Sequence, residues 1–125
     1  EMLQGMERFG GLFICTTNLF DELDEAALRR FTFKVKFRPL RAEQREAMFV
    51  VEALSGEADK LTTEQRDRLA ALDQLAPGDF AAVKRQVDVL GVGFEADEFL
   101  AQLESEHRVK PGVRERRGIG FSARP

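Results

Sequence analysis

Two kinds of side chain in the first third of the chain could act on a phosphate group. The first is Asn18, which directly follows residues 12–17, a continuous apolar and β-prone run. We expect this run to form a strand covered on both faces. Ligands of open α/β sheets bind beyond the carboxyl ends of strands, where a neutral amide can orient a water molecule or contact a phosphate oxygen. Asn also favours turns by bonding its own backbone, so a plain turn residue remains the alternative.

The second kind is an arginine pair, Arg29 and Arg30, at the end of a short helix that we predict over residues 25–30. Asp24 is well placed as the N-cap of this helix. Cations in a last turn suit the negative end of the helix dipole, so the pair could be ordinary surface residues. A role directed at phosphate would require a second surface that carries the nucleotide.

A strict alternation of apolar with polar or basic residues over residues 31–37 predicts a second strand with one wet, basic face. Two strands are too few for a stable parallel sheet, which normally needs three or more or additional cover. We therefore expect this chain to be the C-terminal end of a larger domain.

After Pro39 the pattern changes to helices. Each predicted helix has a start signal or an apolar stripe, and Thr62 with Gln65 resembles a capping box. The predicted helices cover residues 42–55, 63–75, 79–90 and 96–107. Four amphipathic helices with short connections indicate a small bundle, with the boundary to the β-containing part at residue 39 or 40.

Charge and composition exclude several classes of function. The net charge of −3 argues against a dedicated nucleic-acid binder. Residues 1–106 carry −8 and residues 107–125 carry +5, so the tail differs in kind from the body. A single Cys provides no disulfide framework, and His107 has no second His or Cys near it in sequence, so neither a zinc site nor an oxidising compartment is indicated. No apolar stretch approaches membrane-spanning length, and a cytoplasmic location fits best.

Two nucleotide-binding motifs are absent or misplaced. The chain contains no phosphate loop of the form G-x-x-x-x-G-K-[ST]. Gly91-x-Gly93-x-x-Ala96 matches a dinucleotide fingerprint in form, but it follows a predicted helix where the mechanism requires a strand. A helix-to-helix loop explains it better.

In combination, residues 11–31 resemble the second region of homology of the AAA family of ATPases. That region reads strand, Thr-Asn, a short loop with Leu-Asp, then Ala-Leu and Arg-Phe, and the same order runs from Thr17-Asn18 through Leu23-Asp24 to Arg30-Phe31. The third predicted helix opens with Gly-Asp-Phe-Ala-Ala over residues 78–82, which is similar to the family's helical lid. The resemblance covers about residues 2–107.

The resemblance implies a fold and a domain plan. The fold class would be an α/β remnant followed by an all-α bundle, that is, the last strands of a P-loop-type parallel sheet plus the four-helix lid of AAA+ proteins. Residues 1–39 would belong to the α/β ATPase subdomain and residues 40–107 to the lid. Residues 108–125 would form a basic C-terminal tail.

The resemblance also implies roles for particular residues. Asn18 matches the sensor-1 position, near the γ-phosphate and the attacking water. Arg29 and Arg30 match the arginine-finger region, whose guanidinium reaches the ATP of a neighbouring subunit. Phe31 follows directly, whereas the best-known branch of the family has a Gly and a further Arg there, so which arginine is the finger stays open.

In the lid, the resemblance points to residues that would bind the nucleotide. Gly78 and Asp79 match the turn that approaches the adenine. No arginine occupies the usual sensor-2 position, and Lys84 and Arg85 follow a turn later, where either could substitute.

The resemblance further implies that ATP and Mg²⁺ are cofactors of a longer parent protein. The family places the phosphate loop and the acidic metal-binding strand before the region that this chain covers, so we expect no ATPase activity from this chain alone. The implied partners are neighbouring subunits of a homo-oligomeric ring and a protein substrate. The alternative is a non-enzymatic helical domain that binds a protein or a nucleic acid.

Overall fold

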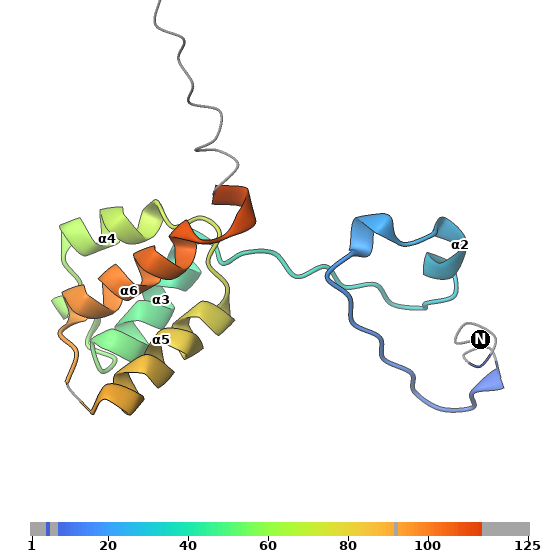
Figure 1. Ribbon diagram of the computed structural model, residues 1–125, viewed down its shortest axis with the longest axis horizontal. Coiled ribbons are helices and arrows are strands. Elements are labelled where there is room, and N and C mark those ends of the chain that lie inside the picture. Colours follow the sequence, from blue (N-terminus) through green and yellow to red (C-terminus); the bar gives the residue numbers. More distant parts are fainter. Residues whose placement is uncertain (1–4, 6–7, 92, 114–125) are drawn as a thin grey trace, which may run out of the picture. The chain divides into compact units, whose positions relative to one another are not determined.

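The computed structural model describes residues 5, 8–91 and 93–113 (Figure 1). It divides the chain into two compact units, Glu1–Phe37 and Arg38–Pro125, and each is described by itself below. The predicted basic tail lies outside the described residues from residue 114 onward.

In the described part of the first unit, two short helical elements follow the helical residues Gly5 and Arg8, and no strand is present. The 3-10 helix η1 covers Phe20–Glu22, and the α-helix α2 covers Glu25–Leu28. Asp24 is the N-cap of α2, as predicted, because its Oδ1 accepts a hydrogen bond from the Ala26 amide at 3.2 Å. The helix is two residues shorter than predicted, and Arg29 forms its C-cap.

The prediction of a sheet is wrong for the described residues. Neither residues 12–17 nor residues 31–37 form a strand, so the described structure is helical and contains no remnant of a parallel P-loop-type sheet. β-Prone side chains and an alternating pattern do not make a strand, because a strand exists only when its backbone groups pair with a neighbour. Neither segment has such a neighbour among the described residues. Apart from the half-buried Phe31, their apolar side chains stay exposed, and Phe37 keeps 92% of its surface.

Between residues 38 and 108, the described part of the second unit forms a bundle of four α-helices (Figure 1). Their bounds are α3 Ala42–Ala53, α4 Thr63–Ala70, α5 Pro77–Leu90 and α6 Ala96–Arg108, with the 3-10 helix η2 at Ala58–Lys60. The predicted capping box opens α4, since the Thr62 hydroxyl accepts from the Gln65 amide and the Gln65 side chain accepts from the Thr62 amide, both at 3.1 Å. α4 is five residues shorter than predicted, and α5 starts two residues earlier, with Pro77 in its first turn.

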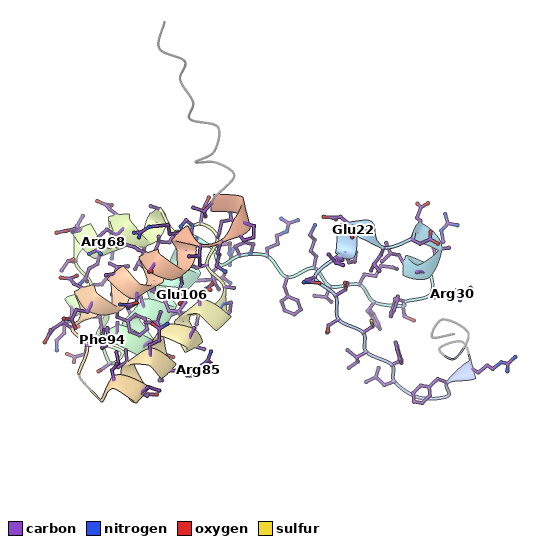
Figure 2. All side chains as sticks on the ribbon, in the orientation of Figure 1. Glu22, Arg30, Arg68, Arg85, Phe94 and Glu106 are labelled. Carbon is purple, nitrogen blue, oxygen red and sulfur yellow. The ribbon has the colours of Figure 1, made fainter. Side chains whose placement is uncertain are left out.

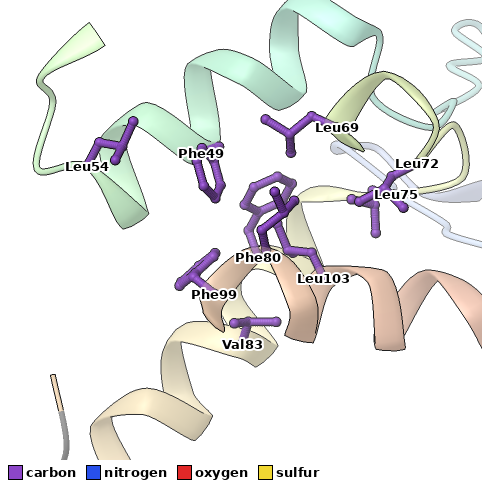
Figure 3. Close-up of a cluster of buried hydrophobic side chains, with 10 residues drawn as sticks. Phe49, Leu54, Leu69, Leu72, Leu75, Phe80, Val83, Phe99 and Leu103 are labelled. Atoms are coloured by element: carbon purple, nitrogen blue, oxygen red, sulfur yellow. The ribbon is translucent and has the colours of Figure 1, made fainter. Parts of the chain in front are cut away.

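Each helix of the bundle supplies side chains to one apolar core (Figure 3). Phe99 of α6 is central to this core. Its ring contacts Phe49 of α3 edge-on at a centroid distance of 6.2 Å and Phe80 of α5 at 6.4 Å. The core residues are Phe49, Leu54, Leu69, Leu72, Leu75, Phe80, Val83, Phe99, Leu100 and Leu103.

A buried arginine explains where α4 ends. Arg45, in the first half of α3, donates its Nε to the Leu69 carbonyl at 2.8 Å and its Nη2 to the Ala70 carbonyl at 3.0 Å, while Nη1 bonds the Leu40 carbonyl. The last carbonyls of a helix have no partner within the helix and carry partial negative charge. The guanidinium satisfies them, and the chain turns away from the helix axis while Leu72 and Leu75 remain in the core.

Polar contacts join α4 to α6 outside the core. Arg68 makes a two-pronged contact with Glu104, with Nε to Oε1 at 2.7 Å and Nη2 to Oε2 at 3.0 Å. The hydrogen bonds from Arg68 hold the pKa of Glu104 below its usual value, although partial burial opposes this shift. Gln65 of α4 makes a further contact with α6, because its side-chain amide donates to Asp97 Oδ1 at 2.9 Å.

Membrane insertion finds no support in the described helices. None of them is both long enough and apolar enough to cross a bilayer.

Candidate functional site

The predicted site residues fall into both units of the structure. Asn18, Arg29 and Arg30 belong to the first unit. Gly78, Asp79, Lys84 and Arg85 lie on or near the first two turns of α5 in the second. The two sets are therefore described one at a time.

Asn18 lies in the loop between residues 12–17 and η1, with its side chain exposed. It lines a shallow hollow formed by residues 17–22 and 35–37. The turn at this point is held by Thr17, whose Oγ1 accepts from the Leu19 amide at 3.0 Å. The Asn18 amide group makes no hydrogen bond among the described residues. Its donor and acceptor are therefore available to a ligand.

Charged groups also border this hollow. Lys36 Nζ lies 3.6 Å from Asp21 Oδ1 and 5.9 Å from the centre of the Phe20 ring. Both charged side chains are more than half exposed, so the ion pair contributes little to stability. A ligand with phosphate groups would meet one cation, Lys36, and two carboxylates, Asp21 and Glu22, here in addition to the Asn18 amide.

Arg29 and Arg30 follow the end of α2. The Arg29 side chain is 79% exposed, with its Nη2 4.0 Å from Glu25 Oε2, which is a weak i,i+4 contact. The Arg30 amide donates to the Ala27 carbonyl at 3.2 Å, and the Phe31 amide donates to the Leu28 carbonyl at 3.3 Å. Backbone hydrogen bonds therefore continue past the last residue of α2 and hold both arginines on a defined turn.

Gly78 and Asp79 form the first turn of α5 but have different surroundings. Asp79 is engaged within the bundle, because its Oδ2 accepts from the Ala76 amide at 2.7 Å and lies 2.7 Å from Lys110 Nζ. Gly78 is exposed and faces open space, since a Cβ built at this position would have no atom within 4 Å. The bundle itself does not require a glycine here.

Lys84 and Arg85 differ in whether their charge has a partner in the bundle. Lys84 Nζ reaches Glu52 Oε2 of α3 at 2.7 Å, and this hydrogen bond raises the pKa of the lysine. Arg85 has no ion-pair or hydrogen-bond partner among the described residues, and Figure 2 shows it on the outer side of α5. It lines an apolar groove that is treated below. Of the two candidates, Arg85 is thus the cation still available to a ligand.

Sequence reasoning did not find the polar side chains that organise the bundle. Arg45 and Arg68 lie in helices whose apolar spacing is recognisable in the sequence, but their partners on other helices, Leu69, Ala70 and Glu104, are 24 to 36 residues away in sequence. No local signal marks such pairs. His107, which has no second His or Cys near it in sequence, lies with its Nε2 3.3 Å from Asp73 Oδ1.

The described residues contain no group of three or more His, Cys, Asp or Glu side chains that could hold a metal ion. The Gly91-x-Gly93 motif does not follow a strand in the structure. Gly91 ends α5 in the left-handed conformation, with φ of 62°, as a helix C-cap does.

Comparison with known proteins returned no match to a family model, to a curated protein or to a solved structure.

Proposed function

We propose that this chain is the C-terminal part of an AAA-type ATPase module that acts in ATP hydrolysis within an oligomer. In this proposal α3 to α6 form the lid over the nucleotide. Asn18 acts as sensor-1, and Arg29 or Arg30 acts as the arginine finger. The proposal rests on the sequence resemblance, and the geometry of α5 supports it.

The observation that carries the proposal is the first turn of α5. Asp79 fixes this turn from two sides, through the Ala76 amide and Lys110, while Gly78 presents a bare backbone to open space. A rigid turn without a side chain suits close approach of a flat ring such as adenine. The fold does not need a glycine at this position, so the space in front of its backbone is open to a ligand.

The first unit would contribute the groups that act on the phosphates. Asn18 carries an exposed amide without a hydrogen-bond partner in the described part of the chain, and this amide would orient the attacking water or donate to a phosphate oxygen without adding charge. Arg29 carries an exposed guanidinium held only weakly by Glu25. Arg29 or Arg30 would stabilise the negative charge that develops on the transferred phosphoryl group, an effect of about 10³- to 10⁵-fold in rate for arginine fingers.

ATP would supply the phosphoryl group, and Mg²⁺ would neutralise charge on its phosphates. The proposal assigns the metal to the acidic strand of the parent module, outside the residues named above. Asn18, Arg29 and Arg30 would contact only water and phosphate oxygens.

The test compares ATP binding and turnover by this chain with those of a version extended upstream in its gene. We expect only the longer protein to bind and hydrolyse ATP. In that protein Arg29→Ala combined with Arg30→Ala should nearly abolish turnover and leave ATP affinity within a few-fold. Asn18→Ala should slow hydrolysis while binding is retained. Arg66→Ala, on the bundle surface, is the matched control.

Two results would contradict the proposal. Absence of nucleotide binding by the longer protein would refute the ATPase assignment as a whole. Unchanged turnover of the double arginine variant in a verified oligomer would refute the finger role. It would leave the assignment of α3 to α6 as the lid untouched.

A second candidate function is a helical domain that binds another protein without catalysis. The observation in its favour is that every fully buried apolar side chain of the described residues belongs to the bundle, which thus has a core of its own. Under this alternative the upstream extension adds no nucleotide binding.

A further inference from the structure

The outer side of α5 carries an apolar groove in addition to the face that packs in the core. Phe80 and Val83 occupy the core face of this helix. The groove residues of α5 are spaced by three and four positions, which places them on one side of the helix. The groove is lined by Ala82, Arg85, Gln86, Val89 and Leu90 of α5, Phe94 of the following loop and Gln102 of α6.

Two of these residues are large, apolar and exposed. Val89 keeps 84% of its surface and Leu90 keeps 60%. Single exposed apolar residues are normal, but these two line one groove together with Ala82 and the half-buried Phe94, and an exposed apolar groove is typical of a surface that contacts another helix. α5 therefore has one apolar face that the bundle covers and a second side on which Val89 and Leu90 stay in water next to Arg85 and Gln86.

The polar groups at the rim indicate the charge of the partner. Gln86 of α5 donates to Glu106 of α6 at 3.2 Å, which holds these two side chains together beside the groove. The neighbouring Lys84 is neutralised by Glu52. Arg85 has no ion-pair partner among the described residues, and Figure 2 shows it on α5, with Phe94 and Glu106 labelled on the same bundle. Arg85 is thus a cation beside the apolar residues of α5, while the Glu106 carboxylate on α6, bonded by the neutral Gln86 amide, keeps its charge.

We infer that this groove binds an amphipathic helix of another protein, with apolar residues at i, i+3, i+4 and i+7 and a carboxylate beside that stripe. The apolar residues would cover Val89 and Leu90. The carboxylate would pair with the guanidinium of Arg85, whose planar fork matches the two oxygens. This inference does not depend on the ATPase proposal, because its test needs no nucleotide and neither Gly78 nor Asp79 lines the groove; Arg85 is the one residue that the groove shares with the predicted nucleotide-binding residues.

The probe is a synthetic, fluorescently labelled helical peptide of about 18 residues, long enough to form helix when bound. It carries Leu at the stated spacing and Glu beside the Leu stripe. A matched peptide carries Lys in place of each Glu. Binding to the full chain is measured by fluorescence anisotropy. We expect the Glu peptide to bind at least about tenfold more tightly than the Lys peptide.

Variants of the chain separate the groove from other surfaces. Val89→Asp should weaken binding of the Glu peptide at least about tenfold, because it places a carboxylate among apolar side chains. Val51→Asp is the matched control, since Val51 is also exposed but lies on α3. Arg85→Glu should reverse the preference, so that the Lys peptide binds better than the Glu peptide. Circular dichroism checks that each variant keeps its helices.

Three outcomes would overturn the inference. One is equal affinity for the two peptides, and another is binding that Arg85→Glu leaves unchanged. The third is a concentration-dependent dimer, seen in sedimentation and abolished by Val89→Asp, which would assign the groove to a second copy of this chain. If Val89→Asp loses its helical signal, the charge reversal at Arg85 decides alone.

Discussion

The buried arginine of α3 leads to a sharp prediction about stability. Arg45→Met keeps the apolar stem of the side chain and removes the guanidinium that bonds the carbonyls of Leu40, Leu69 and Ala70. Hydrogen bonds to a charged group contribute about 1.5–3 kcal/mol each. Desolvation of the arginine and partial replacement by water offset some of this, so we expect a loss of about 3–5 kcal/mol. Such a loss is a large share of the 5–15 kcal/mol typical of small domains.

The assay is urea unfolding of the full chain followed by far-UV circular dichroism, which reports mainly on α3 to α6. Arg66→Met is the matched control, because Arg66 also lies on the bundle but its side chain is 53% exposed and forms an ion pair with Glu46 at 3.3 Å. An exposed pair of this kind contributes about 0–1 kcal/mol. Arg45→Lys should fall between the two, since one ammonium group cannot reach three carbonyls. If Arg45→Met costs no more than Arg66→Met, the role of Arg45 in ending α4 is refuted.

Three further predictions concern single positions in the bundle. Ser55 has a φ of 54°, which is costly for any residue with a Cβ, so Ser55→Gly should stabilise the chain by about 0.5–1 kcal/mol in urea unfolding, and a loss would contradict the strain. Arg68 lowers the pKa of Glu104, so the carboxylate stabilises the fold above its unfolded pKa of about 4.3 and this contribution is lost as the pH falls through the lower folded pKa. The stability difference between the wild type and Glu104→Gln, measured by urea unfolding from neutral to acidic pH, should therefore shrink on acidification; a difference that grows would disprove this sign. Gly78→Ala should leave the melting temperature unchanged or slightly raised, because the added methyl meets no atom, and a clear loss in a thermal melt would show that the bundle itself needs the glycine.

The groove on α5 and the first turn of α5 give this helix two separate tasks in our proposals. One end presents Gly78, which the bundle does not require, and the other carries Val89 and Leu90, which the bundle does not cover. The two tests are independent, because peptide binding needs no nucleotide and ATP turnover needs no acidic helix. Either proposal can fail without the other.

Local signals in the sequence were sufficient to place the helices of the bundle. The capping box of Thr62 and Gln65 and the N-cap of Asp24 both form as predicted. These contacts join residues two or three positions apart, so the sequence that contains them already contains both partners. The same is true of helical spacing, which depends only on the geometry of one helix.

The sheet could not be predicted in this way. Residues 12–17 and 31–37 have the composition and alternation of strands, but pairing requires a second backbone at the right place, and neither segment has one among the described residues. A strand is a property of two segments, whereas a helix satisfies its backbone within one. The pattern of these residues reports a preference for strand, and the described structure does not form one.

The sequence by itself thus determined where α3, α4 and α6 begin and which helix faces are apolar, whereas it placed the start of α5 two residues late. Tertiary structure alone decided which polar side chains meet, as with Arg45 at the end of α4 and Lys84 at Glu52 of α3. It also decided that Arg85, next to Lys84 in sequence, remains without such a partner among the described residues. The physical reason is that neighbours in a helix point about 100° apart, so each meets a different part of the fold.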